Sequence, residues 1–270
     1  MEQAPASPAP SAALSDMPGL GSIFSAGTNA TLDNVGVLIG LWAACGLPSQ
    51  LLGFVVGVST GMVSESAVRD AVTSQNWPAL SLLGVVALVG MALGLVGYAA
   101  TILLAARAYR GESSSVGDLF VEALGRMGSV LLASALVGVA MGFGFILLFI
   151  PGCYLMVRLS LAVCAVLLED LGATAGISRS WSLVGARFGE TLVFMVALVA
   201  AALVGMIPAV IVNVVLRAGA SAAGGGALGG MLAGLAFNAL QFLVTAWAAS
   251  CMTKFFLEMA ARSPREAPAA

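Results

Sequence analysis

Long apolar runs alternate with short polar gaps along this chain of 270 residues. The runs cover residues 35–62, 79–106, 127–150, 153–168, 191–216 and 228–257. A helix needs roughly 20 mainly apolar residues to cross the hydrocarbon core of a bilayer, with about 17 as the lower limit. The fourth run lies at that limit, and the others exceed it. The pattern predicts an all-α, polytopic membrane helical bundle of about six transmembrane helices. A buried or re-entrant fourth segment is the alternative.

Two of the gaps have a helical pattern of their own. Residues 116–127 place apolar side chains on one face and charged ones on the other, and Ser115 with Asp118 predicts an N-terminal cap. Residues 175–188 repeat this design, with Trp181 on the apolar face and Arg179 and Arg187 on the opposite face. We interpret both segments as amphipathic helices that lie in the inner membrane interface.

These two segments also match each other at a constant offset along the chain. The matching pairs are Phe120 and Trp181, Arg126 and Arg187, Gly128 and Gly189, and Leu131 and Leu192. A weaker third copy begins around Ile23 and Phe24. The pattern predicts three units, each an interfacial helix followed by a transmembrane hairpin, and hence two or three interfacial helices. The alternative is coincidence, because any amphipathic helix that leads into a span looks similar.

The two ends of the chain are polar or small in composition. Residues 1–21 are rich in Ala, Pro and Ser, which predicts a disordered tail. Residues 22–259 form the expected membrane domain, and residues 260–270 a short cytoplasmic tail. Eight of the 11 basic residues follow even-numbered spans, namely Arg107, Arg110, Arg126, Arg179, Arg187, Lys254, Arg262 and Arg265. The positive-inside rule then places both termini in the cytoplasm.

Composition narrows the chemistry further. Hydrophobic residues make up 60% of the chain and charged residues 9%, the net charge is -2, and there is no histidine. No basic patch is available for nucleic acid, and no imidazole is available for catalysis or metal binding. The four cysteines lack CxxC spacing, so we expect no metal, no cofactor and no disulfide. Glycines recur at spacing four, which predicts close helix packing; the pairs are Gly36/Gly40, Gly53/Gly57, Gly90/Gly94, Gly138/Gly142 and Gly226/Gly230/Gly234.

A few residues within or beside the spans are candidates for function. Pro151 and Gly152 predict a turn between the third and fourth runs. Arg158 lies inside the fourth run, where a charge is costly; it either snorkels to the outer headgroups, binds a phosphate or other ligand, or pairs with an acid. Glu169 ends that run at a helix C-terminus, and Arg179 is the cation expected to pair with it. The other polar residues in spans, Asn213, Asn238 and Gln241, are placed to bond between helices or to line a polar path.

One stretch resembles a known family. It runs from Phe149-Ile150-Pro151-Gly152 through Tyr154 and Arg158-Leu159-Ser160 to Glu169, then Arg179-Ser180-Trp181 and Arg187-Phe188. This is similar to bacterial membrane proteins related to the membrane domain of glycerophosphoryl diester phosphodiesterase. Cys153 and Phe188 depart from the family's usual pattern. The resemblance implies a bacterial inner-membrane protein of membrane architecture only; we expect the phosphodiesterase catalytic domain to be absent, because it needs histidines.

Together these features predict an integral membrane protein without catalytic activity, which scaffolds or acts on membrane lipids or partner membrane proteins. The alternative is a transporter or permease for a small or lipid-like substrate, and a lipid-modifying enzyme is the third possibility. A cluster of Arg158, Glu169 and Asn213 around a polar cavity would favour transport or catalysis. Dispersal of these residues to the lipid headgroups would favour the first hypothesis.

Overall fold

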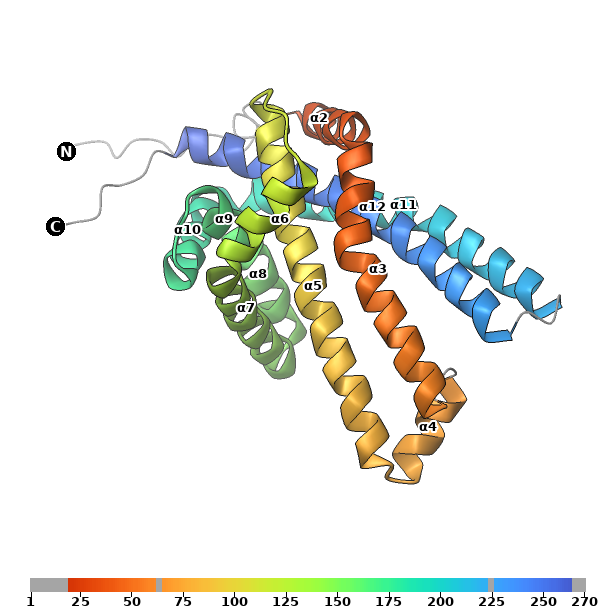
Figure 1. Ribbon diagram of the computed structural model, residues 1–270. Helices are drawn as coiled ribbons and strands as arrows, with labels where there is room; N and C mark the ends of the chain where they lie inside the picture. Colours follow the sequence, from red (N-terminus) through yellow and green to blue (C-terminus); the bar gives the residue numbers. More distant parts are fainter. Residues whose placement is uncertain (1–18, 62–64, 223–225, 264–270) are drawn as a thin grey trace, which may run out of the picture.

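The computed structural model describes residues 19–61, 65–222 and 226–263, and this part of the chain is all-helical (Figure 1). Its helices, labelled as in Figure 1, are α2 (Leu20–Asp33), α3 (Val35–Thr60), α4 (Glu65–Thr73), α5 (Trp77–Tyr109), α6 (Val116–Gly125), α7 (Met127–Leu147), α8 (Phe149–Leu159), α9 (Ala162–Leu168), α10 (Ala173–Ala186), α11 (Phe188–Ala222) and α12 (Gly226–Arg262). Most of the predicted N-terminal tail and C-terminal tail lies outside the described residues. α2 already begins at Leu20, inside the range that we assigned to the tail.

Six helical segments are long and apolar enough to cross a membrane, as the hydrophobic pattern predicted. The fourth of these, Phe149–Leu168, consists of α8 and α9 with a break between them. Ser160 ends α8, and Leu161 precedes α9. The fourth run is therefore long enough to span, but as two short helices rather than one continuous helix.

The helix-then-hairpin order of the three predicted units is present, and the placement of the short helices in the membrane interface stays a prediction. In each, a short helix leads into a long one through a single non-helical residue: Asn34 between α2 and α3, Arg126 between α6 and α7, and Arg187 between α10 and α11. At every junction this residue's carbonyl accepts the first hydrogen bond of the long helix, at 3.0–3.1 Å from the backbone nitrogens of Leu38, Val130 and Thr191. The direction of the chain thus changes without an orphaned carbonyl.

The short helices gather at one end of the molecule and build its core there. The second half of α5 is surrounded by α2, α6, α9 and α12, and its residues from Ala99 to Ala106 are buried. Phe194 of α11 and Phe255 of α12 stack with their ring centroids 4.1 Å apart, and both are buried. From this core the hairpins α3/α5, α7/α8 and α11/α12 point in different directions (Figure 1).

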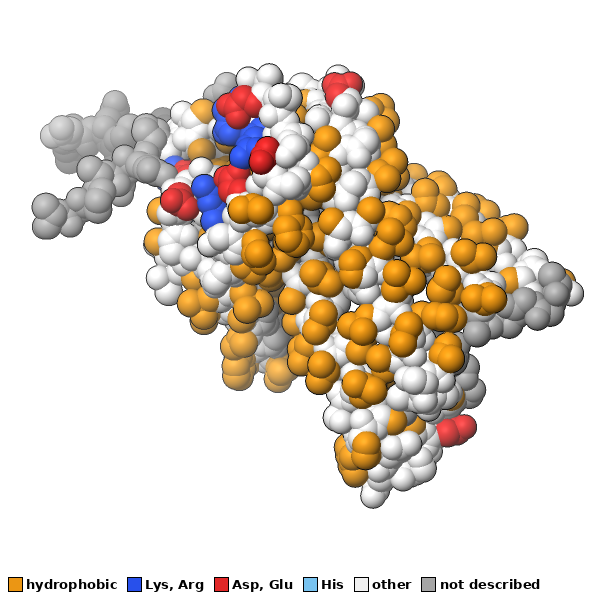
Figure 2. Space-filling model, in the orientation of Figure 1, with side chains coloured by type: hydrophobic (Ala, Val, Ile, Leu, Met, Phe, Trp, Pro, Cys, Tyr) orange, Lys and Arg blue, Asp and Glu red, His pale blue; other side chains and the backbone are white. Residues whose placement is uncertain are grey.

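Away from the core, the hairpins expose apolar side chains. Ile146 and Ile150, at the tip of the α7/α8 hairpin, are 82% and 78% exposed. The space-filling view shows an apolar surface over α3 and α5, whereas charged side chains gather around α6 (Figure 2). We call this charged end, with Arg107, Glu122, Arg126, Glu169 and Arg179, the polar end. Such exposure is costly in water but not in hydrocarbon, so it agrees with a membrane protein.

The turn between the third and fourth runs differs from the prediction. The chain reverses at Leu148, which is extended at φ -165° and ψ 144°, and Phe149 to Gly152 already form the first turn of α8. Proline is tolerated in a first helical turn because the N–H it lacks would have no intrahelical partner. Gly152 has a packing role, because a Cβ there would lie 2.5 Å from the ring of Phe145.

The glycine pairs at spacing four were mostly a misleading signal. A Cβ on Gly36, Gly53, Gly138, Gly142, Gly230 or Gly234 would meet nothing within 4 Å in the described part of the chain. Gly40 does pack closely, because a Cβ there would lie 2.7 Å from Val116 of α6. The other tight contacts occur at glycines outside the pattern, such as Gly27 beside Cys251 and Gly176 beside Val166. Gly27 and Gly176 face the core, whereas the six glycines with open space contact no neighbouring helix among the described residues.

Candidate functional site

The seven candidate residues fall into four places on α8, α9, α10 and α11. Arg158 contacts Trp181, Glu169 pairs with Arg179, Arg187 pairs with Glu190, and Pro151 with Gly152 begins α8. The first two pairs both join the broken fourth span to α10. The structure therefore brings together the residues on either side of the Glu169-Asp170 turn.

The break in the fourth span is held by α10. Because the helix is interrupted after Leu159, the carbonyl of Arg158 cannot continue the regular α-helical ladder. The hydroxyl of Ser180, which is fully buried, donates to this carbonyl over 2.8 Å. In a low-dielectric environment an unsatisfied carbonyl costs several kcal/mol, about the amount that such a hydrogen bond avoids. Ser180 thus stabilises the broken conformation.

The side chain of Arg158 also contacts α10. Its Nη1 donates to the backbone carbonyl of Trp181 over 2.9 Å, and its Nε donates to the hydroxyl of Tyr154 over 2.9 Å. The guanidinium carbon lies 4.6 Å from the centroid of the Trp181 ring and 5.3 Å from that of Tyr154. These are favourable cation–π distances. The ring of Phe188 packs beside that of Tyr154 in a tilted arrangement, with centroids 5.2 Å apart.

A glycine makes this approach possible. A Cβ on Gly185 would lie 2.3 Å from Nη1 of Arg158. Only glycine at this position lets the guanidinium lie against the backbone of α10. We call Tyr154, Arg158, Trp181, Gly185 and Phe188 the Arg158 site.

Arg158 forms no ion pair within the part of the chain that the structure describes. Among the described residues, no carboxylate oxygen lies within 4.0 Å of its guanidinium nitrogens. Within the same part of the chain, Nη2 makes no hydrogen bond, and Nη1 has one N–H left. The flanking aromatic rings are open to the surroundings, since Tyr154 is 39% and Trp181 42% exposed. The arrangement holds a cation in place and leaves one edge of its fork available to an anion.

The predicted pair of Glu169 and Arg179 is confirmed. Arg179 Nε lies 3.1 Å from Glu169 Oε2, and the two side chains are only 14% and 11% exposed. Nη2 of Arg179 also donates to the carbonyl of Ser263 over 3.1 Å, which links α10 to the end of α12. This well-packed pair ties three helices together at the polar end.

Sequence reasoning missed a second charged cluster beside it. Arg126 lies between Glu122, at 3.3 Å, and Asp170, at 3.4 Å, and it also donates to the carbonyl of Leu167. Arg107 pairs with the same Glu122. The sequence signal for this cluster was the i, i+4 spacing of Glu122 and Arg126 on the predicted helix. Positive and negative charges balance here, so the cluster serves to hold α5, α6 and α9 together.

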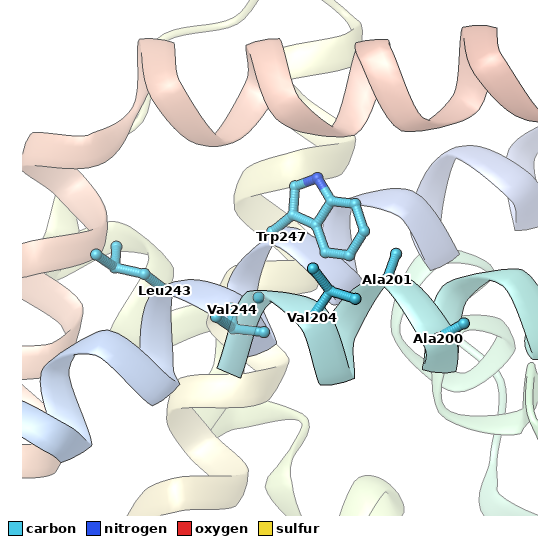
Figure 3. Close-up of a pocket in the computed structure, with 7 residues that line it drawn as sticks. Ala200, Ala201, Val204, Leu243, Val244 and Trp247 are labelled. Carbon is cyan, nitrogen blue, oxygen red and sulfur yellow. The ribbon is translucent and has the colours of Figure 1, made fainter. Parts of the chain in front are cut away.

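A groove between two of the long helices is lined by apolar side chains. A groove of about 640 Å³ lies between α11 and α12, and Ala200, Ala201, Val204, Leu243, Val244 and Trp247 line it (Figure 3). Trp247 turns its indole nitrogen to the hydroxyl of Thr28 on α2, 3.1 Å away. The groove offers apolar contacts and no group that could catalyse a reaction.

Comparison with known protein families, curated proteins and solved structures finds no match to this chain. Function is therefore inferred from the residues and geometry of the site itself.

Proposed function

We propose that the chain is an integral membrane protein that acts on membrane lipids without catalysing a reaction, and that it holds the phosphate of an anionic lipid at the Arg158 site. The observation that supports this most is that the Arg158 guanidinium, within a candidate membrane span, forms no ion pair with a carboxylate of the described residues. An arginine side chain keeps its charge in proteins. A charge in a span needs a partner, water or a headgroup, because its burial in hydrocarbon costs several kcal/mol, roughly 2.5 or more.

The geometry suits an oxyanion. Two N–H groups on one edge of a guanidinium match the spacing of two phosphate oxygens, and such charge-assisted bonds are stronger than neutral ones. The contacts of Arg158 to Tyr154 and Trp181 fix the plane of the guanidinium, which lowers the entropy lost on binding. The exposed rings of Tyr154 and Trp181 suit the boundary between headgroups and acyl chains.

The separation of the polar residues supports lipid binding over catalysis. Arg158 contacts Trp181, Glu169 pairs with Arg179, and Asn213 Nδ2 donates to the carbonyl of Ala233 over 3.1 Å. These are three separate contacts, whereas a reaction centre would need the groups to converge.

We extend the proposal to the bacterial inner membrane, with both termini in the cytoplasm. The gathering of charge at the polar end, and the eight basic residues that follow even-numbered spans, support this orientation. The resemblance to the membrane domain of glycerophosphoryl diester phosphodiesterase supports the bacterial assignment. Partner membrane proteins remain part of the hypothesis.

The test is to identify the lipids that stay bound after purification in a mild detergent. We expect the wild-type protein to retain anionic phospholipid, detected by mass spectrometry. Arg158→Gln should lose it. Arg217→Gln, which removes an exposed arginine from α11, is the matched control and should retain it. Equal retention by both variants would contradict the proposal.

A transporter for a lipid-like substrate is the second candidate, and the three units of helix plus hairpin favour it, since many transporters contain internal repeats. Proteoliposomes with a fluorescent anionic phospholipid would distinguish the two. Under our first proposal, movement of this lipid between leaflets should be no faster than in protein-free vesicles.

A further inference from the structure

A second cavity, unlike the apolar groove, has several polar side chains among its lining residues. It lies between α5 and α12 and has a volume of about 190 Å³. Its lining residues on α5 are Gly94, Tyr98 and Thr101, and those on α12 include Asn238, Gln241 and Thr245. Both helices are candidate membrane spans. Polar groups at such a depth are uncommon, so their convergence on one cavity needs an explanation.

Several of these groups have hydrogen-bonding capacity that the described part of the chain does not use. The Asn238 Oδ1 accepts from the indole of Trp42 over 3.3 Å, which leaves its Nδ2 donors without a partner there. Neither the Gln241 amide nor the Tyr98 hydroxyl has a hydrogen bond within the described residues. Gln241 is exposed and Asn238 and Tyr98 are half-buried, so within a span these groups face the cavity or the bilayer. An amide left unpaired in an apolar medium costs at least about 1–3 kcal/mol.

The remaining groups are acceptors. The hydroxyls of Thr101 and Thr245 donate to backbone carbonyls of their own helices, over 2.7 and 2.9 Å, so their lone pairs face outward as acceptors. No charged side chain lines the cavity. An ion would therefore meet no compensating charge, whereas a neutral molecule with several hydroxyl groups would meet both donors and acceptors.

We propose that this cavity binds an uncharged glycerol unit, either as a free small polyol or as part of a lipid. A hydroxyl both donates and accepts, which matches the mixed lining. The volume corresponds to the share of about six water molecules in the liquid, which suits a glycerol-sized molecule. This site is independent of the Arg158 site, because it lies between different helices and binds a neutral ligand.

Gly94 provides a clean way to close the cavity. It lines the cavity, and a Cβ on it would meet nothing within 4 Å. A leucine there would occupy the space without a clash at its first carbon. Gly84 lies on the same helix, has the same freedom and does not line the cavity, so Gly84→Leu is a matched control.

The experiment uses the purified full-length chain and two probes. Saturation-transfer NMR with free glycerol tests the polyol source, and native mass spectrometry with monooleoylglycerol tests the lipid source. We expect one probe to bind the wild-type protein and the Gly84→Leu control. Gly94→Leu should lose at least tenfold in affinity for that probe. Gln241→Leu, which removes the amide at nearly constant volume, should weaken binding as well.

Binding of neither probe would overturn the proposal, since the cavity would then hold water only. Binding that Gly94→Leu leaves unchanged would also overturn it, because the probe would lie elsewhere. If Gly94→Leu does not fold, Gly94→Ala with Gln241→Leu gives the same comparison. Retention of anionic phospholipid at the Arg158 site is measured separately, so either proposal can fail alone.

Discussion

Arg158 contacts Trp181 twice, with its guanidinium carbon 4.6 Å from the centroid of the indole ring and its Nη1 2.9 Å from the backbone carbonyl. The hydroxyl of the neighbouring Ser180 donates a hydrogen bond to the backbone carbonyl of Arg158. Two side chain–backbone hydrogen bonds thus join the broken span to α10, one from a side chain of each segment to the backbone of the other. This arrangement fixes the position of the charge and leaves one edge of it open.

The first prediction concerns the glycine that admits this charge. Gly185→Ala places a methyl group where Nη1 of Arg158 now lies, so the bond to Trp181 should break. The end of a flexible side chain can move, and alanine favours a helix by up to about 1 kcal/mol over glycine. The variant should fold normally and bind anionic lipid several-fold more weakly, as measured by lipid titration.

Gly189→Ala is the control for that substitution. Gly189 is four residues further along, and a Cβ there would meet nothing within 4 Å. Its lipid affinity should equal that of the wild-type protein. Equal affinities in both alanine variants would show that the position of Arg158 does not matter for binding.

The second prediction concerns the pair of Glu169 and Arg179. Arg179→Ala removes a mostly buried partner of Glu169 and the contact to Ser263. The loss should lower the free energy of unfolding by about 3 kcal/mol, because the Glu169 carboxylate stays in a poorly hydrated place. Arg110→Ala breaks a pair whose side chains are 57% and 51% exposed, so water screens the pair and its loss should be close to neutral. Thermal unfolding in detergent compares them, and similar losses would refute this ranking.

Much of the architecture followed from periodicity. The six apolar runs and the amphipathic patterns before Arg126 and Arg187 predicted helices that the structure contains. Ser115 caps α6 as expected, since its Oγ accepts from the backbone nitrogen of Asp118 over 3.1 Å. The Glu169–Arg179 pair was predictable because a carboxylate at a helix C-terminus needs a cation.

Other features had no local signal. The break at Ser160 contains neither proline nor glycine, and Ser180, distant in sequence, stabilises it by donating a hydrogen bond to the carbonyl of Arg158. Leu148 reverses the chain in an extended conformation that any residue adopts. The helix α4, in the polar gap between the first and second runs, was also missed. Contacts between residues distant in sequence determine the structure at such positions, and a single sequence does not show which residues make those contacts.

The third prediction tests the packing of α2. A Cβ on Gly27 would lie 2.4 Å from the sulfur of Cys251 and 3.3 Å from its backbone nitrogen. Because backbone cannot move aside easily, Gly27→Ala should destabilise the protein by about 1–3 kcal/mol. Gly21→Ala, on the same helix with open space, should be neutral or slightly stabilising. Unfolding temperatures would measure both, and an unaffected Gly27→Ala would mean that α2 is not packed on α12 in this way.

The fourth prediction concerns orientation in the membrane. With six spans and basic residues concentrated after the even-numbered ones, both termini should be cytoplasmic. A reporter fused after Ala270 should then give the cytoplasmic signal, and one inserted at residues 224–226 the opposite signal. The same signal from both sites would rule out the six-span arrangement.

The most direct test of the account is the affinity of the Arg158 site for lipid phosphate. Native mass spectrometry with titrated phosphatidylglycerol and phosphatidylcholine would give both affinities for the wild-type protein and for Arg158→Lys. Lysine keeps the charge but lacks the planar fork. We predict that the wild-type protein prefers phosphatidylglycerol and that Arg158→Lys loses about tenfold in this affinity, equivalent to about 1.4 kcal/mol. A wild-type protein without this preference, or a lysine variant that keeps it in full, would contradict the account.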